Sequence, residues 1–126
     1  MNKPHILLIE DDAWLAESYT HVLKSTYLIT TVASSVAAME SIDSEPFDLI
    51  IADVMLENGL VIDLLHELQT HGDTMNTPVI ICSSLASSID IRNLRSYGVV
   101  EVLDKSTLTI KGLRIAIQRA FVSKVV

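Results

Sequence analysis

Short apolar runs alternate along the chain with segments in which apolar residues recur every three or four positions. Five runs have the length and the β-branched content that are typical of strands: His5–Ile9, Tyr27–Val32, Asp48–Ala52, Val79–Cys82 and Val99–Leu103. The first, third and fourth runs do not alternate apolar with polar residues, which predicts strands that are buried on both faces. The second and fifth runs carry polar residues, so we expect them at the edges of the sheet.

One amphipathic segment follows each apolar run. The five predicted helices are Asp12–Lys24, Ser34–Ile42, Leu60–Thr70, Ser88–Tyr97 and Thr107–Val122. Serines suit the start of the second helix, and Gly98 suits the left-handed residue that ends the fourth. Parallel strands need crossover connections, and a helix is the usual crossover. The pattern therefore predicts a five-stranded, doubly wound parallel α/β sheet with helices on both faces.

Length, composition and charge narrow the class of protein. A chain of 126 residues is the size of one domain, and its hydrophobic fraction of 49% excludes intrinsic disorder. The net charge of −7 leaves no basic footprint, so direct nucleic-acid binding by this domain is not expected. No apolar run reaches the ~18–20 residues of a membrane span. The single cysteine suits a reducing compartment, and we expect a cytoplasmic location.

Polar residues lie at or just beyond the ends of four of the predicted strands. Acids occupy positions 10–12 after the first strand, Asp53 follows the third, Ser83 and Ser84 follow the fourth, and Lys105 follows the fifth. The carboxyl ends of parallel strands meet at one edge of a sheet, where ligands of such folds bind. Crowded carboxylates repel one another unless a cation joins them, and Mg²⁺ prefers oxygen ligands. An aspartate beside Mg²⁺ can accept a phosphoryl group, while an ammonium and a hydroxyl donate to its oxygens. These residues predict Mg²⁺-dependent phosphoryl transfer onto a carboxylate.

Each of these residues has a simpler interpretation when it is taken alone. The acids at positions 10–12 could cap a helix N-terminus, where negative charge is favourable. Ser83 could be a turn hydroxyl, and Lys105 could be a surface charge. Trp14, two residues after the acids, could be only a partly buried packing residue or could lie near the site, where its fluorescence would respond to Mg²⁺. Cys82 is expected to be a small buried hydrophobe. The functional interpretation therefore depends on the combination of the strand-end residues.

Four segments resemble the receiver domain of the two-component response-regulator family. They are ILLIEDD at 6–12, DLIIADVML at 48–56, PVIICSS at 78–84 and VLDKS at 102–106. The resemblance implies a flavodoxin-like fold with strand order 2-1-3-4-5 and a single receiver domain over residues 1–126, which could be the N-terminal part of a longer protein. It also implies a signalling phosphoacceptor rather than an enzyme, with at most self-catalysed phosphorylation and slow autodephosphorylation.

The resemblance also assigns a role to each matching residue. Asp53 is the phosphoacceptor, which takes phosphoryl from a phosphohistidine of a sensor histidine kinase or a phosphotransfer protein. Ser83 matches the switch hydroxyl, the Ser84 backbone N–H contacts a phosphoryl oxygen, and Lys105 matches the invariant lysine. An output domain or partner protein would read the state of the domain, and a homodimer could form on phosphorylation.

The same resemblance implies a Mg²⁺ site. Glu10 and Asp11 form its acidic pair, with Asp11 preferred over Glu10 as the direct metal ligand. Asp53 is a second ligand, and the backbone carbonyl of Met55 is a third.

Three departures from the family pattern keep an alternative open. Val102 stands where the family has an aromatic residue, so phosphorylation would be read out through the Ser83 loop and the following helix. The loop at 57–61 lacks the usual proline, and Ser106 follows Lys105 where the family often has a cis proline. The alternative is a degenerate receiver that binds partners independently of phosphorylation. Flavodoxin-like or phosphatase-like enzymes fit less well, because acids follow the first strand and Met55 replaces a second aspartate.

Overall fold

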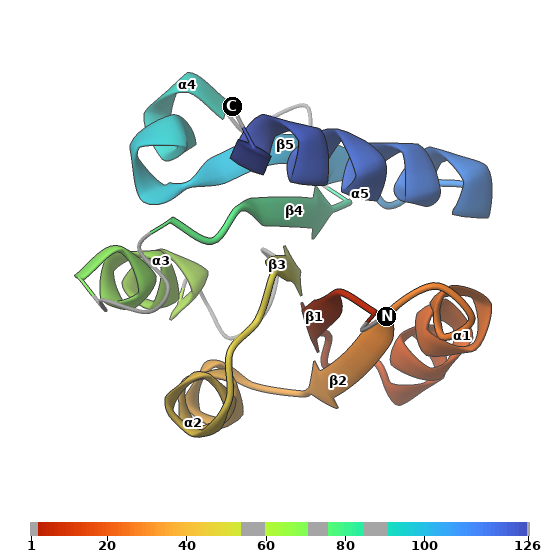
Figure 1. Ribbon diagram of the computed structural model, residues 1–126, viewed down its shortest axis with the longest axis horizontal. Helices are drawn as coiled ribbons and strands as arrows, with labels where there is room; N and C mark the ends of the chain where they lie inside the picture. Colours follow the sequence, from red (N-terminus) through yellow and green to blue (C-terminus); the bar gives the residue numbers. More distant parts are fainter. Residues whose placement is uncertain (1–2, 54–59, 71–75, 85–90, 126) are drawn as a thin grey trace.

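The computed structural model describes residues 3–53, 60–70, 76–84 and 91–125 of the chain. Five parallel strands form one sheet in the order β2-β1-β3-β4-β5 (Figure 1). The strands are β1 (His5–Ile9), β2 (Leu28–Val32), β3 (Leu49–Asp53), β4 (Val79–Ser83) and β5 (Val99–Asp104). The predicted fold class is confirmed, and the two runs with polar residues are indeed the edge strands β2 and β5.

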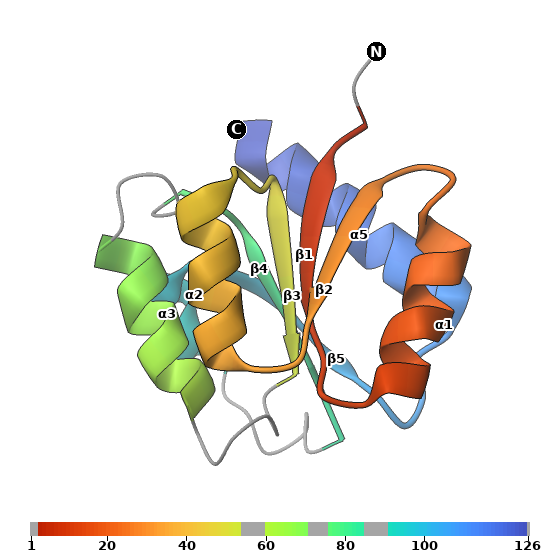
Figure 2. The ribbon, with the colours of Figure 1, turned by 90° about the horizontal axis from the view of Figure 1, so that it is seen from below.

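Helices cover both faces of the sheet. They are α1 (Ala13–Leu23), α2 (Ser35–Ser44), α3 (Leu60–Thr70), α4 (Ile91–Leu94) and α5 (Ile110–Val125), with a 3-10 helix, η3 (Arg95–Tyr97), after α4. The helices α1 and α5 lie on one face, and α2, α3 and α4 lie on the other (Figures 1 and 2). The first three residues of the predicted fourth helix, 88–90, lie outside the described residues.

Two apolar clusters, one on each face, make the core. Leu7, Ile50 and Ile81 belong to the cluster that includes Leu65 of α3, while Leu8 and its neighbours belong to the cluster under α1 and α5. Successive residues of a strand point to opposite faces, so strands between two helical layers must be apolar on both. This is why β1, β3 and β4 read as unbroken hydrophobic runs.

The boundaries of two helices are set by local hydrogen bonds. The Ser34 hydroxyl accepts from the Ala37 N–H at 3.1 Å and caps α2, as predicted. The fifth helix begins at Ile110, three residues later than predicted, because residues 104–107 form a turn. The Thr109 hydroxyl accepts from the Gly112 N–H at 3.0 Å and supplies a hydrogen-bond partner in the first turn of α5.

The strand register brings the strand-end residues to one edge of the sheet. Ile9 pairs with Ala52, and Ser83 pairs with Asp104. The carboxyl ends of the strands therefore lie together in Figure 2, at the edge of the sheet opposite the label N. Residues that follow β1, β3, β4 and β5 are placed within reach of one another there.

Candidate functional site

Three carboxylates meet at the carboxyl edge of the sheet. Glu10, Asp11 and Asp53 each contribute an oxygen that lies within 4.8 Å of the others. Glu10 comes directly after β1, and its backbone N–H donates to the Val32 carbonyl at 2.9 Å. Asp53 is the last residue of β3. Glu10 and Asp53 are each 5% exposed, whereas Asp11 is exposed to solvent.

Lys105 lies between the two buried carboxylates. Its Nζ donates to Glu10 Oε1 at 2.8 Å and to Asp53 Oδ2 at 2.9 Å. The lysine side chain is 16% exposed, so the pairing takes place largely away from bulk water. One ammonium therefore offsets part of the repulsion between Glu10 and Asp53.

Burial and pairing shift the pKa values of this cluster. Burial raises the pKa of Glu10, and the neighbouring Asp53 adds to that rise, while the hydrogen bond from Lys105 opposes it without cancelling it. Burial disfavours the charged form of Lys105, but hydrogen bonds and attraction from Glu10 and Asp53 outweigh it and raise the pKa of this ammonium. The lysine is therefore held in its charged form, and the cluster carries a net negative charge that favours a cation.

The serines predicted after β4 lie at the same edge. Ser83 is completely buried, and its backbone carbonyl accepts from the Lys105 N–H at 3.0 Å. Ser84, the next residue, is exposed. Met55 and most of the 57–61 loop lie outside the described residues. The structure thus brings together five of the predicted site residues and places Ser84 beside them in the chain.

Asp12 has the simpler role that was considered for the whole acidic run. Its carboxylate accepts from the backbone N–H groups of Trp14 at 3.0 Å and Leu15 at 3.2 Å, and so it caps the N-terminus of α1. The three consecutive acids therefore divide between two functions: Asp12 caps the helix, and the first two acids join Asp53.

Sequence reasoning missed the part played by Asp104. Its Oδ1 accepts from the Ser106 N–H at 2.9 Å and from the Ser106 hydroxyl at 2.6 Å. An aspartate side chain commonly accepts from the backbone N–H two residues on, in an Asx turn, so Asp104 just after the fifth apolar run was a visible signal in the sequence. The peptide bond between Lys105 and Ser106 is trans.

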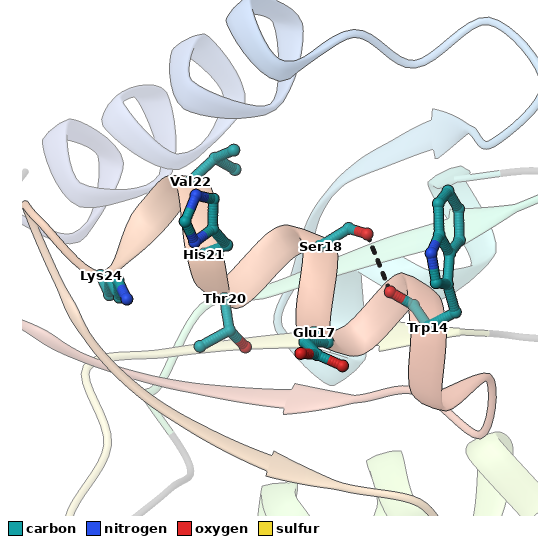
Figure 3. Close-up of a pocket in the computed structure, with 7 residues that line it drawn as sticks. All are labelled: Trp14, Glu17, Ser18, Thr20, His21, Val22 and Lys24. Carbon is teal, nitrogen blue, oxygen red and sulfur yellow. Dashed lines mark hydrogen bonds between the residues drawn. The ribbon is translucent and has the colours of Figure 1, made fainter.

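Two of the hollows that border α1 are open to solvent. The larger one, about 590 Å³, follows the outer side of the helix and is lined by Trp14, Glu17, Ser18, Thr20, His21, Val22 and Lys24 (Figure 3). The smaller one, about 380 Å³, reaches Glu10 and Asp11. The smaller hollow therefore adjoins the carboxylate cluster, whereas none of the three carboxylates lines the larger.

The prediction that Trp14 is partly buried was wrong. Its side chain is 72% exposed at the first turn of α1, at one end of the larger hollow (Figure 3). The apolar stripe of α1 that faces the core runs instead through Ala16 and Leu23. Cys82, by contrast, is buried as predicted.

The donor set fits a hard divalent cation. Magnesium binds oxygen at about 2.0–2.1 Å, so opposite ligands lie about 4.2 Å apart, and it usually keeps several waters. Carboxylate oxygens within 4.8 Å of one another match that span closely enough for one ion with waters to bridge them. The exposure of Asp11 leaves one carboxylate open to an incoming cation.

The comparison with known families gives the class of protein. A family model described as the response regulator receiver domain matches residues 6–118. The chain therefore belongs to the response regulator receiver domain family and is a receiver domain of the two-component type.

Individual relatives agree with this class. The chain is 35% identical over 108 residues to the transcriptional regulatory protein DcuR of Escherichia coli K12. This match covers 80% of this chain and 44% of that protein. It is 31% identical over 103 residues to the transcriptional activator protein PfeR of Pseudomonas aeruginosa PAO1. This second match covers 81% of this chain and 33% of that protein. The matched region is thus less than half the length of these curated relatives.

Solved structures share the fold. The chemotaxis response regulator CheY4 of Vibrio cholerae superposes with a TM-score of 0.85 at 19% identity, covering 94% of this chain and 99% of that chain. A sensor protein from Polaromonas sp. JS666 gives a TM-score of 0.87 at 22% identity, covering 96% and 98%. Within the described ranges, no helix has both the length and the apolar character needed to cross a membrane.

Proposed function

We propose that this receiver domain accepts a phosphoryl group on Asp53 from the phosphohistidine of a sensor histidine kinase or phosphotransfer protein. The observation that carries the proposal is the buried Asp53 carboxylate, whose Oδ2 lies 2.9 Å from Lys105 Nζ in a cluster with Glu10 and Asp11. A carboxylate oxygen of Asp53 forms the new O–P bond. The N–P bond of the donor breaks, and its electron pair remains on the imidazole nitrogen.

Each neighbouring group has a task in this transfer. The Lys105 ammonium would donate to a phosphoryl oxygen, and the Ser83 hydroxyl and the Ser84 N–H would supply further donors. Glu10, Asp11, Asp53 and the Met55 carbonyl would hold Mg²⁺. The ion would supply positive charge that offsets the charge of the transferring phosphoryl group.

The domain would act as a switch for another domain or protein. The curated relatives are named as transcriptional regulators and are more than twice as long as the matched region. We propose that an output domain or a separate partner reads the phosphorylated state. The net charge of −7 argues that DNA contact, if the whole protein makes it, belongs to that other part.

The decisive experiment is phosphoryl labelling by a small acyl phosphate in the presence of Mg²⁺. The expected result is one added phosphoryl group by intact mass, absent after removal of Mg²⁺ with a chelator and absent in Asp53→Asn. Asp63→Asn, which changes an exposed aspartate of α3, is the matched control and should label like the wild type. The absence of an adduct under conditions that label an ordinary receiver would support the degenerate alternative.

Val102 motivates a second test, of the way in which phosphorylation is read out. Its side chain is partly buried and packs against the first core cluster, and it has no ring that could move between buried and exposed positions. We propose that the segment after Ser83 carries the signal instead. If Val102→Tyr leaves partner binding and its dependence on phosphorylation unchanged, the aromatic position is not the missing element.

A further inference from the structure

The turn that carries Lys105 is held by side-chain hydrogen bonds. Residues 104–107 contain neither glycine nor proline, which usually set the backbone angles of a turn. The Asp104 carboxylate accepts both from the Ser106 N–H and from the Ser106 hydroxyl, at 2.9 and 2.6 Å. The Thr107 N–H closes the turn on the Asp104 carbonyl at 3.2 Å. The conformation of this turn therefore depends on the aspartate side chain.

Lys105 lies between two anchors. Its own N–H donates to the Ser83 carbonyl at 3.0 Å, which ties it to the end of β4. On the other side, the next residue is tied back to Asp104. A lysine side chain is long and flexible, so holding its ammonium in one place requires a fixed backbone as well as fixed partners. At the far end of the side chain, Nζ reaches Glu10 and Asp53 within 2.9 Å.

We propose that Asp104 is a positioning residue for Lys105. Its carboxylate, acting through Ser106, fixes the backbone from which the lysine ammonium reaches Asp53 and, on the proposed function, the phosphoryl group that Asp53 receives. Asp104 is absent from the carboxylates that cluster at the site, so its effect is transmitted through the turn. The hydrogen bonds from Ser106 also lower the pKa of Asp104, which keeps the accepting carboxylate ionised near neutral pH.

Three variants separate the turn from the charge. Asp104→Ala removes the acceptor. Asp104→Asn keeps an oxygen that can form the same Asx turn without the charge. Ser106→Ala removes the hydroxyl donor and keeps the backbone N–H. Asp63→Ala is the control for loss of an exposed acid elsewhere on the surface.

Two measurements are made on each variant. The first is the ¹H–¹⁵N NMR signal of the Lys105 ammonium in the whole 126-residue chain. This signal is sharp only while the ammonium stays hydrogen-bonded and ordered. The second is the rate of acyl-phosphate labelling as a function of donor concentration, which separates the maximal rate from half-saturation. We expect Asp104→Ala to broaden the ammonium signal and to lower the maximal rate by roughly tenfold, less than the ~100-fold loss that a 1 Å misplacement of a reacting group can cause. Asp104→Asn should restore both to within about twofold, and Ser106→Ala should lie between them.

The outcomes distinguish this inference from the proposed function. A wild-type signal and labelling rate in Asp104→Ala, or equal losses in Asp104→Ala and Asp104→Asn, would overturn the positioning role. If no variant and no wild-type protein takes a phosphoryl group, the proposed function fails, while the Lys105 signal still decides whether Asp104 positions the lysine.

Discussion

At the scale of single residues, the carboxylate cluster shows burial and pairing acting in opposite directions. Burial raises the pKa of Glu10, and its hydrogen bond to Lys105 at 2.8 Å opposes that rise. For Lys105 the pairing prevails, so the ammonium remains charged between two buried acids. Removing any one of these charged groups therefore changes the protonation of the others and the stability of the fold.

Loss of the lysine should destabilise the fold. Lys105→Met leaves Glu10 and Asp53 buried without their cation. Breaking a fully buried pair costs about 3–5 kcal/mol, and the partial exposure of the cation reduces the expected loss to about 2–3 kcal/mol. The control is Lys111→Met, which changes an exposed lysine of α5. Urea unfolding in the presence of a chelator measures both. Equal small losses in the two variants would show that the Lys105 pair contributes nothing measurable.

Glu10 should make stability depend on pH. Because its pKa in the folded chain is raised above the usual 4.5, the folded state holds this proton more tightly than the unfolded chain does. Stability is therefore fullest below the usual value and is lost as the pH rises through the raised pKa. Without Mg²⁺, Glu10→Gln should become increasingly more stable than the wild type as the pH rises from that region towards neutrality.

Thermal unfolding over a pH series checks this sign. Glu17→Gln, at an exposed acid of α1, is the matched control. A difference between Glu10→Gln and the wild type that stays constant with pH would contradict the raised pKa. Addition of Mg²⁺ should favour the wild type, because only the wild type keeps the carboxylate at position 10.

At the scale of elements, the ends of strands and helices place the site. The segment between α4 and β5 depends on Gly98, which has φ 88° and donates its N–H to the Arg95 carbonyl at 3.0 Å. This left-handed residue ends η3 and directly precedes β5, the strand that leads to Lys105. A Cβ at this position would lie 3.4 Å from the Thr77 carbonyl, which is an ordinary contact. The constraint on residue 98 is therefore its backbone angle rather than space.

Gly98→Ala should lower stability by about 1–2 kcal/mol, the cost of a left-handed conformation for a residue with a Cβ. Gly112→Ala is the control, because Gly112 lies within α5, where alanine is favoured by about 1 kcal/mol. Its new Cβ would lie 3.2 Å from the Thr109 hydroxyl, which offsets part of that gain. Chemical denaturation of both variants gives the comparison. A Gly98→Ala protein as stable as the wild type would show that the turn can be rebuilt.

At the scale of the whole molecule, the two apolar clusters share the central strands, so opening one exposes the other. Cys82 lies in β4, is 4% exposed, and belongs to the cluster under α1 and α5. Burial raises the pKa of its thiol to about 12. The thiol is thus both covered and protonated in the folded chain.

Cys82 should therefore report opening of the central sheet. At pH 8 in native buffer, labelling by a thiol-specific reagent should be slow and should accelerate with urea in step with unfolding measured by circular dichroism. In fully denaturing urea the same thiol should react at the rate of a free cysteine. Rapid labelling in native buffer would mean that β4 opens locally without global unfolding.

The hydrophobic pattern is sufficient to predict the sheet and the residues at its carboxyl edge. A strand buried on both faces must be apolar throughout, so the residue at which the run stops marks the strand end. This is how Glu10, Asp53 and Ser83 could be identified from their positions. Lys105 lies two residues beyond the fifth run, and the family pattern was needed to single it out. The helix cap at Ser34 and the left-handed residue at Gly98 could also be predicted from the sequence, because each depends only on residues within about one helical turn of it.

Tertiary structure decides what these residues do to one another. Only the folded chain brings Lys105 within 2.9 Å of acids that lie 52 and 95 positions away, and only burial turns that proximity into shifted pKa values. Folding also separates Asp12, which caps α1, from Glu10 and Asp11, although the three are consecutive. It exposes Trp14, and it places the turn that Asp104 holds locally beside acids that are distant in the sequence. Spatial neighbours and water access depend on the whole chain, and therefore no local pattern specifies them.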